Sequence, residues 1–454
     1  MKRVVVLGGG PAGLYAALLL ARRDIPVTVL ERESRPGGLT AGTEVAGMPV
    51  DYGSHRLHPS TDPDILADLR SILGEDLQMR PRNGRIRFDG TWIGFPLSPG
   101  EMSRRVSPST LARLAMGAAG AMLRPTRTDT FARFIETGLG KAMGDLFYFP
   151  YARKLWGLEP DQLSGEQARR RIAADTPWRL VGRAFQKDDV GREFFYPRGG
   201  FGQIATGLAS AAIEAGADIR LGDAAQRVTP RGDGFDLATS EDDIAAHLLL
   251  STVPITTLAR LLVPPDEVVG AVESLRFRAM VLVYLTVPTS QWTEFDAHYF
   301  PGEEVGFTRV SEPKNYRDGP DPQDRSVVCV EIPSDLNDET WSSHDQDLVD
   351  SVSAQIASVG LPDPGKQGRV HRIPHAYPVH RVGSEGALDT VAEWLGTHDR
   401  IVTYGRQGLF AHDNTHHAMA MARDAVACVS DDLEFDRGCW GEARMRFSRH
   451  VVED

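Results

Sequence analysis

Short apolar runs near the start of the chain alternate with a helical pattern. Arg3–Leu7 and Val27–Glu31 are rich in β-branched and other apolar residues, which is typical of strands buried on both faces of a parallel sheet. Between them, Leu14–Arg22 is long enough and apolar enough to form a helix. This order predicts a strand–helix–strand unit that begins at residue 2.

The rest of the chain predicts strands and helices in mixed order. Strands are expected at Asp218–Leu221, Gln226–Thr229, Leu248–Val253, Met280–Thr286, Ser326–Ile332 and Ile401–Tyr404, and short strands with turns within Arg85–Phe95. Helices are expected at Asp62–Leu73, Gln203–Ala215, Leu348–Gly360 and Thr415–Val429, with a mostly helical stretch over Pro108–Ala174. A Pro- and Asp-rich segment is predicted to be a surface loop, Glu312–Asp324.

One apolar stretch, Leu111–Leu123, allows two interpretations. A core helix is favoured over a surface that contacts a membrane. No run of the chain approaches the roughly 20 apolar residues that span a bilayer, and the N-terminus lacks the features of a signal peptide. We therefore expect no transmembrane segment and a cytoplasmic location.

Three glycines directly follow the first predicted strand. Gly8, Gly10 and Gly13 form the pattern G-x-G-x-x-G, in which the first glycine permits a tight turn and the second a close approach of backbone to a pyrophosphate. Gly13 permits close packing of helix on strand, and the helix N-terminus offers N–H groups to phosphates. Glu31 ends the second strand and can accept hydrogen bonds from a ribose. The pattern predicts dinucleotide binding but leaves FAD and NAD open.

The composition narrows the function further. A formal net charge of −12 argues against a general nucleic-acid binder. The three cysteines are far apart, show no metal-ligand spacing and are expected to be reduced thiols: Cys329, Cys428 and Cys439. A histidine cluster includes an i, i+4 pair but has no third spaced ligand, so no metal site is expected at His412, His416 and His417.

The residues after Glu31 favour FAD. Arg35, Gly37 and Gly38 add a basic residue and a double glycine to the motif. This resembles the flavin-binding start shared by amine oxidases, protoporphyrinogen oxidases and phytoene desaturases, in which such residues lie along the FAD pyrophosphate and ribityl chain. The resemblance implies that FAD contacts Gly8, Gly10, Pro11, Ala12, Gly13, Glu31, Arg32, Arg35, Gly37, Gly38 and Leu39.

Two later segments resemble the surroundings of the flavin ring. Asp51-Tyr-Gly-Ser-His-Arg56 looks like the ring-side loop of UDP-galactopyranose mutases and their relatives, and Gly405–Asn414 looks like their C-terminal flavin motif. The resemblance implies that His55 faces the ring, and that Asp413 or Asn414 caps a helix whose N-terminus points at the ring. The further cofactor contacts that it implies are Gly53, Ser54, Arg56, Val228, Gly405, Arg406 and Thr415.

Other segments resemble the substrate region of the mutases. Tyr151–Gly157 is similar to the mutase segment Tyr-x-x-Lys-x-Trp-Gly, and Leu275–Ala279 to a second arginine-bearing segment. The substrate contacts implied are Arg153, Trp156, Arg170, Arg278 and Tyr377. A solvated helix face explains Arg170 equally well, and a structural salt bridge explains Arg278. His380 and His412 stand where the relatives have other residues, which weakens any transfer of the mutase substrate.

We expect an α/β fold with two intertwined domains. A Rossmann-like FAD-binding domain, with a parallel sheet and helices, would comprise residues 1–60, 190–260 and 385–454. A substrate-binding domain of antiparallel sheet and helices would comprise residues 61–189 and 261–384, with its helical part at about 100–185. Strand patterns at the start, middle and end of the chain indicate this arrangement.

The first functional hypothesis is an FAD-dependent oxidoreductase. It would transfer a hydride from a small-molecule substrate (a sugar, cyclitol, amine or related metabolite, in a biosynthetic reaction) to flavin N5, with O2 or another acceptor reoxidising the flavin. Candidate catalytic residues are His55, His412 and Tyr377. The alternatives are a redox-neutral flavin-dependent mutase of a nucleotide-diphosphate sugar and a flavin-containing binding or assembly protein. The sequence does not predict an oligomeric state.

Overall fold

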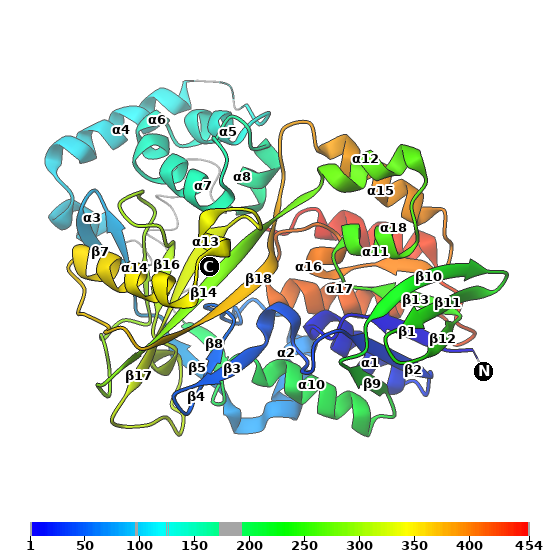
Figure 1. Ribbon diagram of the computed structural model, residues 1–454. Helices are drawn as coiled ribbons and strands as arrows, with labels where there is room; N and C mark the ends of the chain where they lie inside the picture. Colours follow the sequence, from blue (N-terminus) through cyan, green and yellow to red (C-terminus); the bar gives the residue numbers. More distant parts are fainter. Residues whose placement is uncertain (1, 96–98, 124, 126, 172–192, 453–454) are drawn as a thin grey trace.

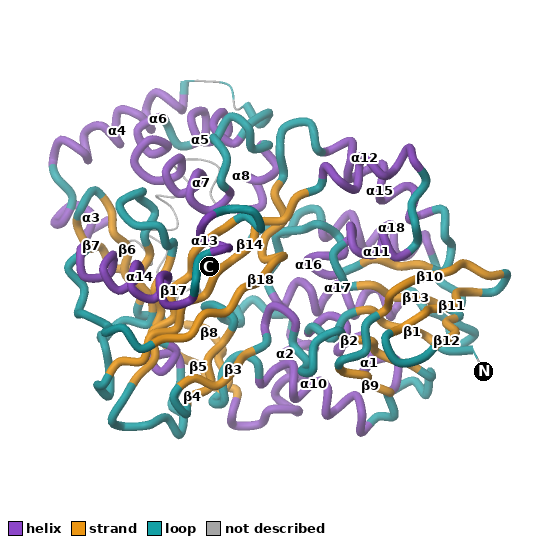
Figure 2. The backbone as a smooth tube through the Cα atoms, in the orientation of Figure 1, coloured by secondary structure: helices purple, strands orange, loops and turns teal. Residues whose placement is uncertain are grey.

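The described residues form two large sheets, three smaller sheets and a block of helices, together with the helices that flank the sheets (Figure 1). The structure is a computed structural model that describes residues 2–95, 99–123, 125, 127–171 and 193–452. Figure 2 shows the strands gathered in two regions, with a largely helical region beside one of them. The mixed α/β class that the sequence predicts is confirmed.

A five-stranded parallel sheet collects strands from distant parts of the chain. Its order is β19-β13-β1-β2-β9, and all neighbouring pairs are parallel. The predicted strands are confirmed, with these bounds: β1 Val4–Leu7, β2 Val27–Glu31, β9 Asp218–Leu221, β13 Leu248–Ser251 and β19 Ile401–Thr403.

Both faces of this sheet are covered, which explains the unbroken apolar runs. Alternate residues of β1 point to opposite faces: Val4 and Val6 pack in one core cluster, and Val5 and Leu7 in another. The first cluster contains α1 Pro11–Ala21, α10 Gln203–Glu214 and α17 Thr415–Ala427; the second contains the three-stranded sheet β10 Ala225–Arg231, β11 Gly234–Thr239 and β12 Asp243–Ala246, and the helices α11 Ile255–Leu261 and α15 Glu385–Gly396.

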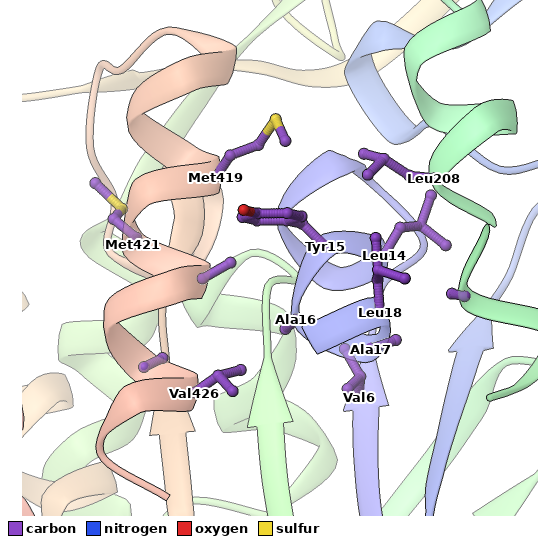
Figure 3. Packing of buried hydrophobic residues seen from close by; sticks show 14 of the residues in the cluster. Val6, Leu14, Tyr15, Ala16, Ala17, Leu18, Leu208, Met419, Met421 and Val426 are labelled. Atoms are coloured by element: carbon purple, nitrogen blue, oxygen red, sulfur yellow. The ribbon is translucent and has the colours of Figure 1, made fainter. Parts of the chain in front are cut away.

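Helix α1 is buried between two other helices. Figure 3 shows Tyr15 beside Met419 of α17, and Leu14 directed toward Leu208 of α10. The Tyr15 hydroxyl donates to Asp68 at 2.7 Å, which satisfies its polar group. Since α1 is apolar all round, it has no solvent face, and its N-terminus is fixed at the end of β1.

The second large sheet is mostly antiparallel. Its order is β18-β14-β17-β16-β15-β6-β7, with only the β15–β6 pair parallel. One face of β14 packs on the helix α14 Asp345–Ser358, and the other packs on the hairpin of β3 Gly42–Val45 and β4 Met48–Asp51. The strands are β6 Gly84–Phe88, β7 Thr91–Phe95, β14 Arg276–Val287, β15 Ala297–Tyr299, β16 Arg309–Ser311, β17 Ser326–Ser334 and β18 Gly368–Val379.

The helical block confirms the predicted helical stretch as far as the described residues extend. Its helices are α3 Pro99–Arg105, α4 Pro108–Met122, α5 Phe131–Gly138, α6 Lys141–Met143, α7 Phe149–Trp156 and α8 Gly165–Arg171. The predicted remainder of this stretch, up to residue 174, lies outside the described residues. The other elements are α2 Pro63–Leu73, β5 Leu77–Pro81, β8 Glu193–Pro197, α12 Asp266–Ser274, α13 Glu339–Ser342, α16 Gly405–Gly408 and α18 Arg437–Phe447.

Three expectations from the sequence are wrong. Helix α4 is a surface helix rather than a core helix, since only Thr110 and Ala121 of it are buried. The predicted surface loop 312–324 is partly buried, because Arg317 and Asp321 form an internal ion pair at 2.7 Å. The three thiols are not all reduced, because a disulfide joins two of them, Cys428 and Cys439.

Within the described residues, no helix has both the length and the apolar content needed to cross a membrane.

Candidate active site

A cavity of about 600 Å³ runs along the carboxyl ends of the parallel strands. Its walls come from the turns after β1, β2, β13 and β19 on one side, and from β14 and β18 of the antiparallel sheet on the other. Ligands of parallel α/β sheets bind outside the carboxyl ends of the strands, and the volume lies within the range of roughly 300–1,000 Å³ that small ligands need.

The glycine turn forms one end of the cavity. Gly8 has φ of +102°, which only glycine adopts readily. A Cβ at Gly13 would lie 2.0 Å from the Gly8 carbonyl oxygen, so this position must be glycine for α1 to pack. A Cβ at Gly10 would meet only the Gly37 carbonyl oxygen, at 3.8 Å. The turn therefore leaves open space beside Gly10, at the N-terminus of α1.

The Glu31 carboxylate holds the glycine turn in place through hydrogen bonds from the backbone. Glu31 is buried, and its carboxylate accepts the backbone N–H of Gly9 at 2.7 Å and that of Glu33 at 2.8 Å. Each oxygen keeps a second lone pair for a ligand hydroxyl. The sequence places Glu31 at the strand end, and the structure shows that it also holds the two backbone segments that border the cavity.

Arg406 lies in the cavity wall close to the start of α17. Its guanidinium donates to the Asp413 carbonyl at 2.8 Å and the Ala376 carbonyl at 3.2 Å, and lies 5.1 Å from the centre of the Tyr377 ring. Asn414 is the N-cap of α17. Because Asn414 and Thr415 line the cavity, the N-terminus of α17, the positive end of its dipole, faces the cavity and favours negative charge there.

His55 lies in the wall between the two ends. Its ring stacks on Phe201 with centroids 5.3 Å apart. Burial, with the charges of Arg309 and Arg406, lowers the pKa of His55 to about 3. The imidazole is therefore neutral at physiological pH.

Two arginines beside His55 have internal carboxylate partners. Arg309 of β16 makes a two-pronged ion pair with Glu331, its cross-strand neighbour on β17, with both N–O distances 2.8 Å. Arg56 pairs with the buried Asp296 at 3.1 Å. Both pairs fix charged groups at the cavity wall, and each balances the charge of its own arginine.

Tyr377 and His412 stack together, but only one of them reaches the cavity. Tyr377 of β18 lines it. His412 lies behind, with ring centroids 5.1 Å apart and planes 8° apart, and is 1% exposed. His412 therefore sets the position of the Tyr377 ring rather than contacting a ligand.

Most of the predicted cofactor residues lie together in the wall. The cavity lining includes Gly8, Gly10, Pro11, Ala12, Glu31, Arg32, Arg35, Gly37, Gly38, Leu39, Gly53, Ser54, His55, Arg56, Gly405, Arg406, Asp413, Asn414 and Thr415. Gly13 lies beneath the turn. Val228 is buried in the core beneath the wall, where Ala224 and Ala225 face the cavity instead.

Four predicted substrate residues do not reach the cavity. Arg153 pairs with Glu159 at 2.8 Å on the surface, and Arg170 pairs with Glu166 at 2.5 Å. Trp156 packs in the core of the helical block against Phe131 and other apolar residues. Arg278 donates to the Leu155 carbonyl at 3.2 Å and pairs with Asp335. Each of the three arginines is thus neutralised by a partner carboxylate. A comparison of sequence motifs does not reveal these partners.

A cluster of one carboxylate and two imidazoles lies at the start of α17. Asp413 is buried, and one oxygen lies 3.5 Å from Nδ1 of both His417 and His450. Burial alone would raise the pKa of Asp413, but the two histidines hold it below its usual range. The three residues offer ligand atoms within 4.8 Å of one another. The imidazoles, however, stack 4.2 Å apart at 17°, so their ring planes do not meet at one ion, and the absence of a metal site stays a prediction.

Several residues of the wall escaped the sequence analysis. Arg82, Arg309, Glu331 and Met280 line the cavity, and all come from the antiparallel sheet or the segment leading into it. Their segments carry no motif. Alternation along β14 is the one available signal, since it places Met280 and Leu282 on the same face.

Most of the chain is similar to flavin-containing proteins. A family model described as flavin-containing amine oxidoreductase matches residues 11–410. Phytoene dehydrogenase of Streptomyces griseus is 28% identical over 288 residues, 58% of this chain and 56% of that protein. Mitochondrial protoporphyrinogen oxidase of Nicotiana tabacum is 26% identical over 173 residues, 36% of this chain and 34% of that protein. The matches cover about half or less of these relatives.

Solved structures share the fold. Reduced UDP-galactopyranose mutase superposes with a TM-score of 0.82 at 19% identity, with complete coverage of both chains. Putrescine oxidase bound to putrescine gives a TM-score of 0.66 at 16% identity, over 94% of this chain and 98% of that one. At these identities the likeness establishes the architecture and leaves the substrate open.

Proposed function

Because this chain belongs to the family of flavin-containing amine oxidoreductases and its cofactor is FAD, we propose that it oxidises a small-molecule substrate by two electrons. The substrate would be a sugar, cyclitol, amine or related metabolite in a biosynthetic reaction. The observation that carries this proposal is that Arg170 and Arg278 form ion pairs with carboxylates outside the cavity. A mutase would need these two arginines to bind the diphosphate of its substrate.

The residues present fit FAD along the whole cavity. The open space beside Gly10 and the N–H groups at the start of α1 would hold the pyrophosphate. The free lone pairs of Glu31 would accept ribose hydroxyls. The N-terminus of α17 would face the flavin ring, where its dipole stabilises negative charge.

When bound, FAD supplies the acceptor for two electrons. The protein would hold the reacting carbon of the substrate next to the flavin and exclude water from the site. A base with a pKa of about 3 is a poor proton acceptor near neutral pH. We therefore assign His55 to orienting the substrate through a hydrogen bond, in place of the role as base that its sequence position suggested. Tyr377 borders the same space, and His412 positions its ring.

The test is anaerobic spectroscopy of the FAD-loaded enzyme with amines, sugar alcohols and cyclitols. We expect one class to bleach the visible flavin absorbance, and O2 or another acceptor to restore it. The control is the same panel added to free FAD. If no compound reduces the bound flavin, the proposal fails.

The second candidate is the redox-neutral mutase. The observation that favours it is the superposition of the complete chain on reduced UDP-galactopyranose mutase. It predicts that the enzyme is inactive as purified and that dithionite activates isomerisation of UDP-galactopyranose without net oxidation. Activity of that kind would replace the first proposal.

A further inference from the structure

Two arginines meet at the cavity wall on the side of the antiparallel sheet. Arg56 follows the His55 loop, and Arg82 lies between β5 and β6; both line the cavity. Their guanidinium groups approach the same atom, the Tyr299 hydroxyl oxygen, at 2.9 Å from Arg56 and 3.5 Å from Arg82. Like charges held this close repel each other unless negative charge offsets them.

The internal carboxylates offset only part of this charge. Asp296 pairs with Arg56, and Glu331 is occupied by both nitrogens of Arg309. Within the described residues, Arg82 has no carboxylate partner at ion-pair distance. Glu193 also lines the cavity, but it is exposed and makes no ion pair with Arg82 there. One positive charge at the wall therefore lacks a counter-charge.

The two guanidinium groups are also held in place by aromatic rings. Phe95 lies under Arg82, 4.6 Å from its Cζ, while Phe194 and Tyr316 lie 5.1 and 4.8 Å from Cζ of Arg56. Such packing orients a guanidinium without neutralising it. The positions of both groups are thus set before any ligand arrives.

Each arginine has a buried N–H without a partner. Nε of Arg56 and Nε of Arg82 are shielded from solvent and make no hydrogen bond. A buried donor left unsatisfied costs roughly 1–3 kcal/mol. An anion at the wall would balance the charge of Arg82.

We propose that Arg82, supported by Arg56, forms a subsite for an anionic group of the substrate, either a carboxylate or a phosphate. The inference rests on the proposed function, since it places this group in the same cavity as the oxidised carbon. It identifies the substrate class as an acid or a phosphate ester. Arg82 is then the residue that sets this specificity, because the charge of Arg56 is already balanced by Asp296.

The test measures binding by calorimetry to the FAD-loaded enzyme, with three probes of similar shape: benzoate, phenyl phosphate and benzamide. We expect one or both anions to bind and the neutral amide to bind far more weakly. Which anion binds distinguishes a carboxylate site from a phosphate site. Loss of one charge-assisted hydrogen bond, about 1.5–3 kcal/mol, predicts that Arg82→Gln weakens anion binding roughly 10- to 100-fold.

Arg82→Lys should keep part of the affinity, because it retains the charge but loses the planar donor geometry. The matched control is Arg80→Gln on the same segment, since Arg80 pairs with the exposed Asp318 and does not line the cavity. FAD content is measured for every variant to show that it is folded.

Two results would overturn the inference: neither anion binds the unmodified enzyme, or Arg82→Gln binds it as well as Arg80→Gln does. Failure of the proposed function is a separate result, because it appears as a flavin that no substrate reduces, whatever the calorimetry shows.

Discussion

At the scale of single residues, Gly10 and Gly13 of the same turn have different surroundings. A methyl group at Gly13 collides with the Gly8 carbonyl, whereas one at Gly10 points into open space. We predict that Gly13→Ala lowers the thermal midpoint of the apoprotein, since the collision forces α1 away from β1. Gly10→Ala should leave that midpoint unchanged but greatly weaken FAD binding.

The measurements are thermal unfolding of the apoprotein and FAD titration by quenching of flavin fluorescence. Exposed Gly386 is the control position, since nothing lies within 4 Å of a Cβ there. Equal FAD affinity of Gly10→Ala and the unmodified protein would show that the pyrophosphate does not lie beside Gly10.

A buried histidine predicts how stability depends on pH. Burial, with the charge of Arg85, lowers the pKa of His298 from 6.5 to about 3. The unfolded chain binds a proton in this range and the folded one does not, so stability falls as pH falls below about 6.5. The slope is about 1.4 kcal/mol per pH unit for one such group.

His298→Gln should therefore remove this slope, even if it is less stable at neutral pH. We expect the gap in unfolding free energy between the two proteins to shrink by roughly 2–3 kcal/mol from about pH 6 to about pH 4. Urea unfolding at several pH values gives the measurement. Parallel curves for the two proteins would mean that His298 is protonated in the folded state.

Residues of local motifs could be predicted, and residues defined by long-range pairing could not. The glycine turn and Glu31 belong to one strand–helix–strand unit, in which spacing alone fixes their places. Arg278 has a suitable type and position in sequence, but Asp335 neutralises it from 57 positions away. Arg82 belongs to no motif, and the role proposed for it depends on the absence of a partner carboxylate among the described residues.

At the scale of elements, a disulfide joins the helix at the cavity to the C-terminal helix. Cys428 at the end of α17 bonds to Cys439 of α18, with a sequence separation of 11. Closing a loop of this length stabilises a protein by about 3 kcal/mol in the chain-entropy model. We predict that Cys439→Ser lowers the unfolding free energy by about 2–3 kcal/mol.

Urea unfolding with and without dithiothreitol measures this effect. Reductant should lower the stability of the unmodified protein to that of Cys439→Ser and leave the variant unchanged. Free thiols in the unfolded, unreduced protein are the control. Three reactive thiols instead of one would contradict the disulfide.

Elements with a clear apolar pattern were predictable, and those with mixed patterns were not. Both β1 and β13 are buried on both faces, so their sequences are continuously apolar. Strand β18 was missed because its first half carries Arg369, His371 and Arg372, whose polar side chains are partly exposed at the sheet edge. The Pro- and Asp-rich composition of segment 312–324 predicts a surface loop, but the charge of Arg317 is paired with Asp321 inside the protein, a partnership that composition does not reveal.

At the scale of the whole molecule, the cavity exists because two sheets built from interleaved segments face each other across it. The parallel sheet contributes the turns that fit FAD, and the antiparallel sheet contributes the wall with Arg82, Arg309 and Tyr377. The sequence indicates the first half through motifs. The second half could not be predicted, because it depends on distant strand pairings such as that of β6 with β15, in which Gly84 lies opposite Ala297.

The measurement that tests the account most directly is the mass of the product formed by the FAD-loaded enzyme from a substrate that reduces it. With O2 or another two-electron acceptor present, the account predicts a product two hydrogens lighter than the substrate or, for an amine, the carbonyl compound and ammonia that hydrolysis of the imine yields; one acceptor molecule is reduced for each product formed. A product of unchanged mass, formed only after prior reduction of the enzyme and with no acceptor consumed, would contradict it.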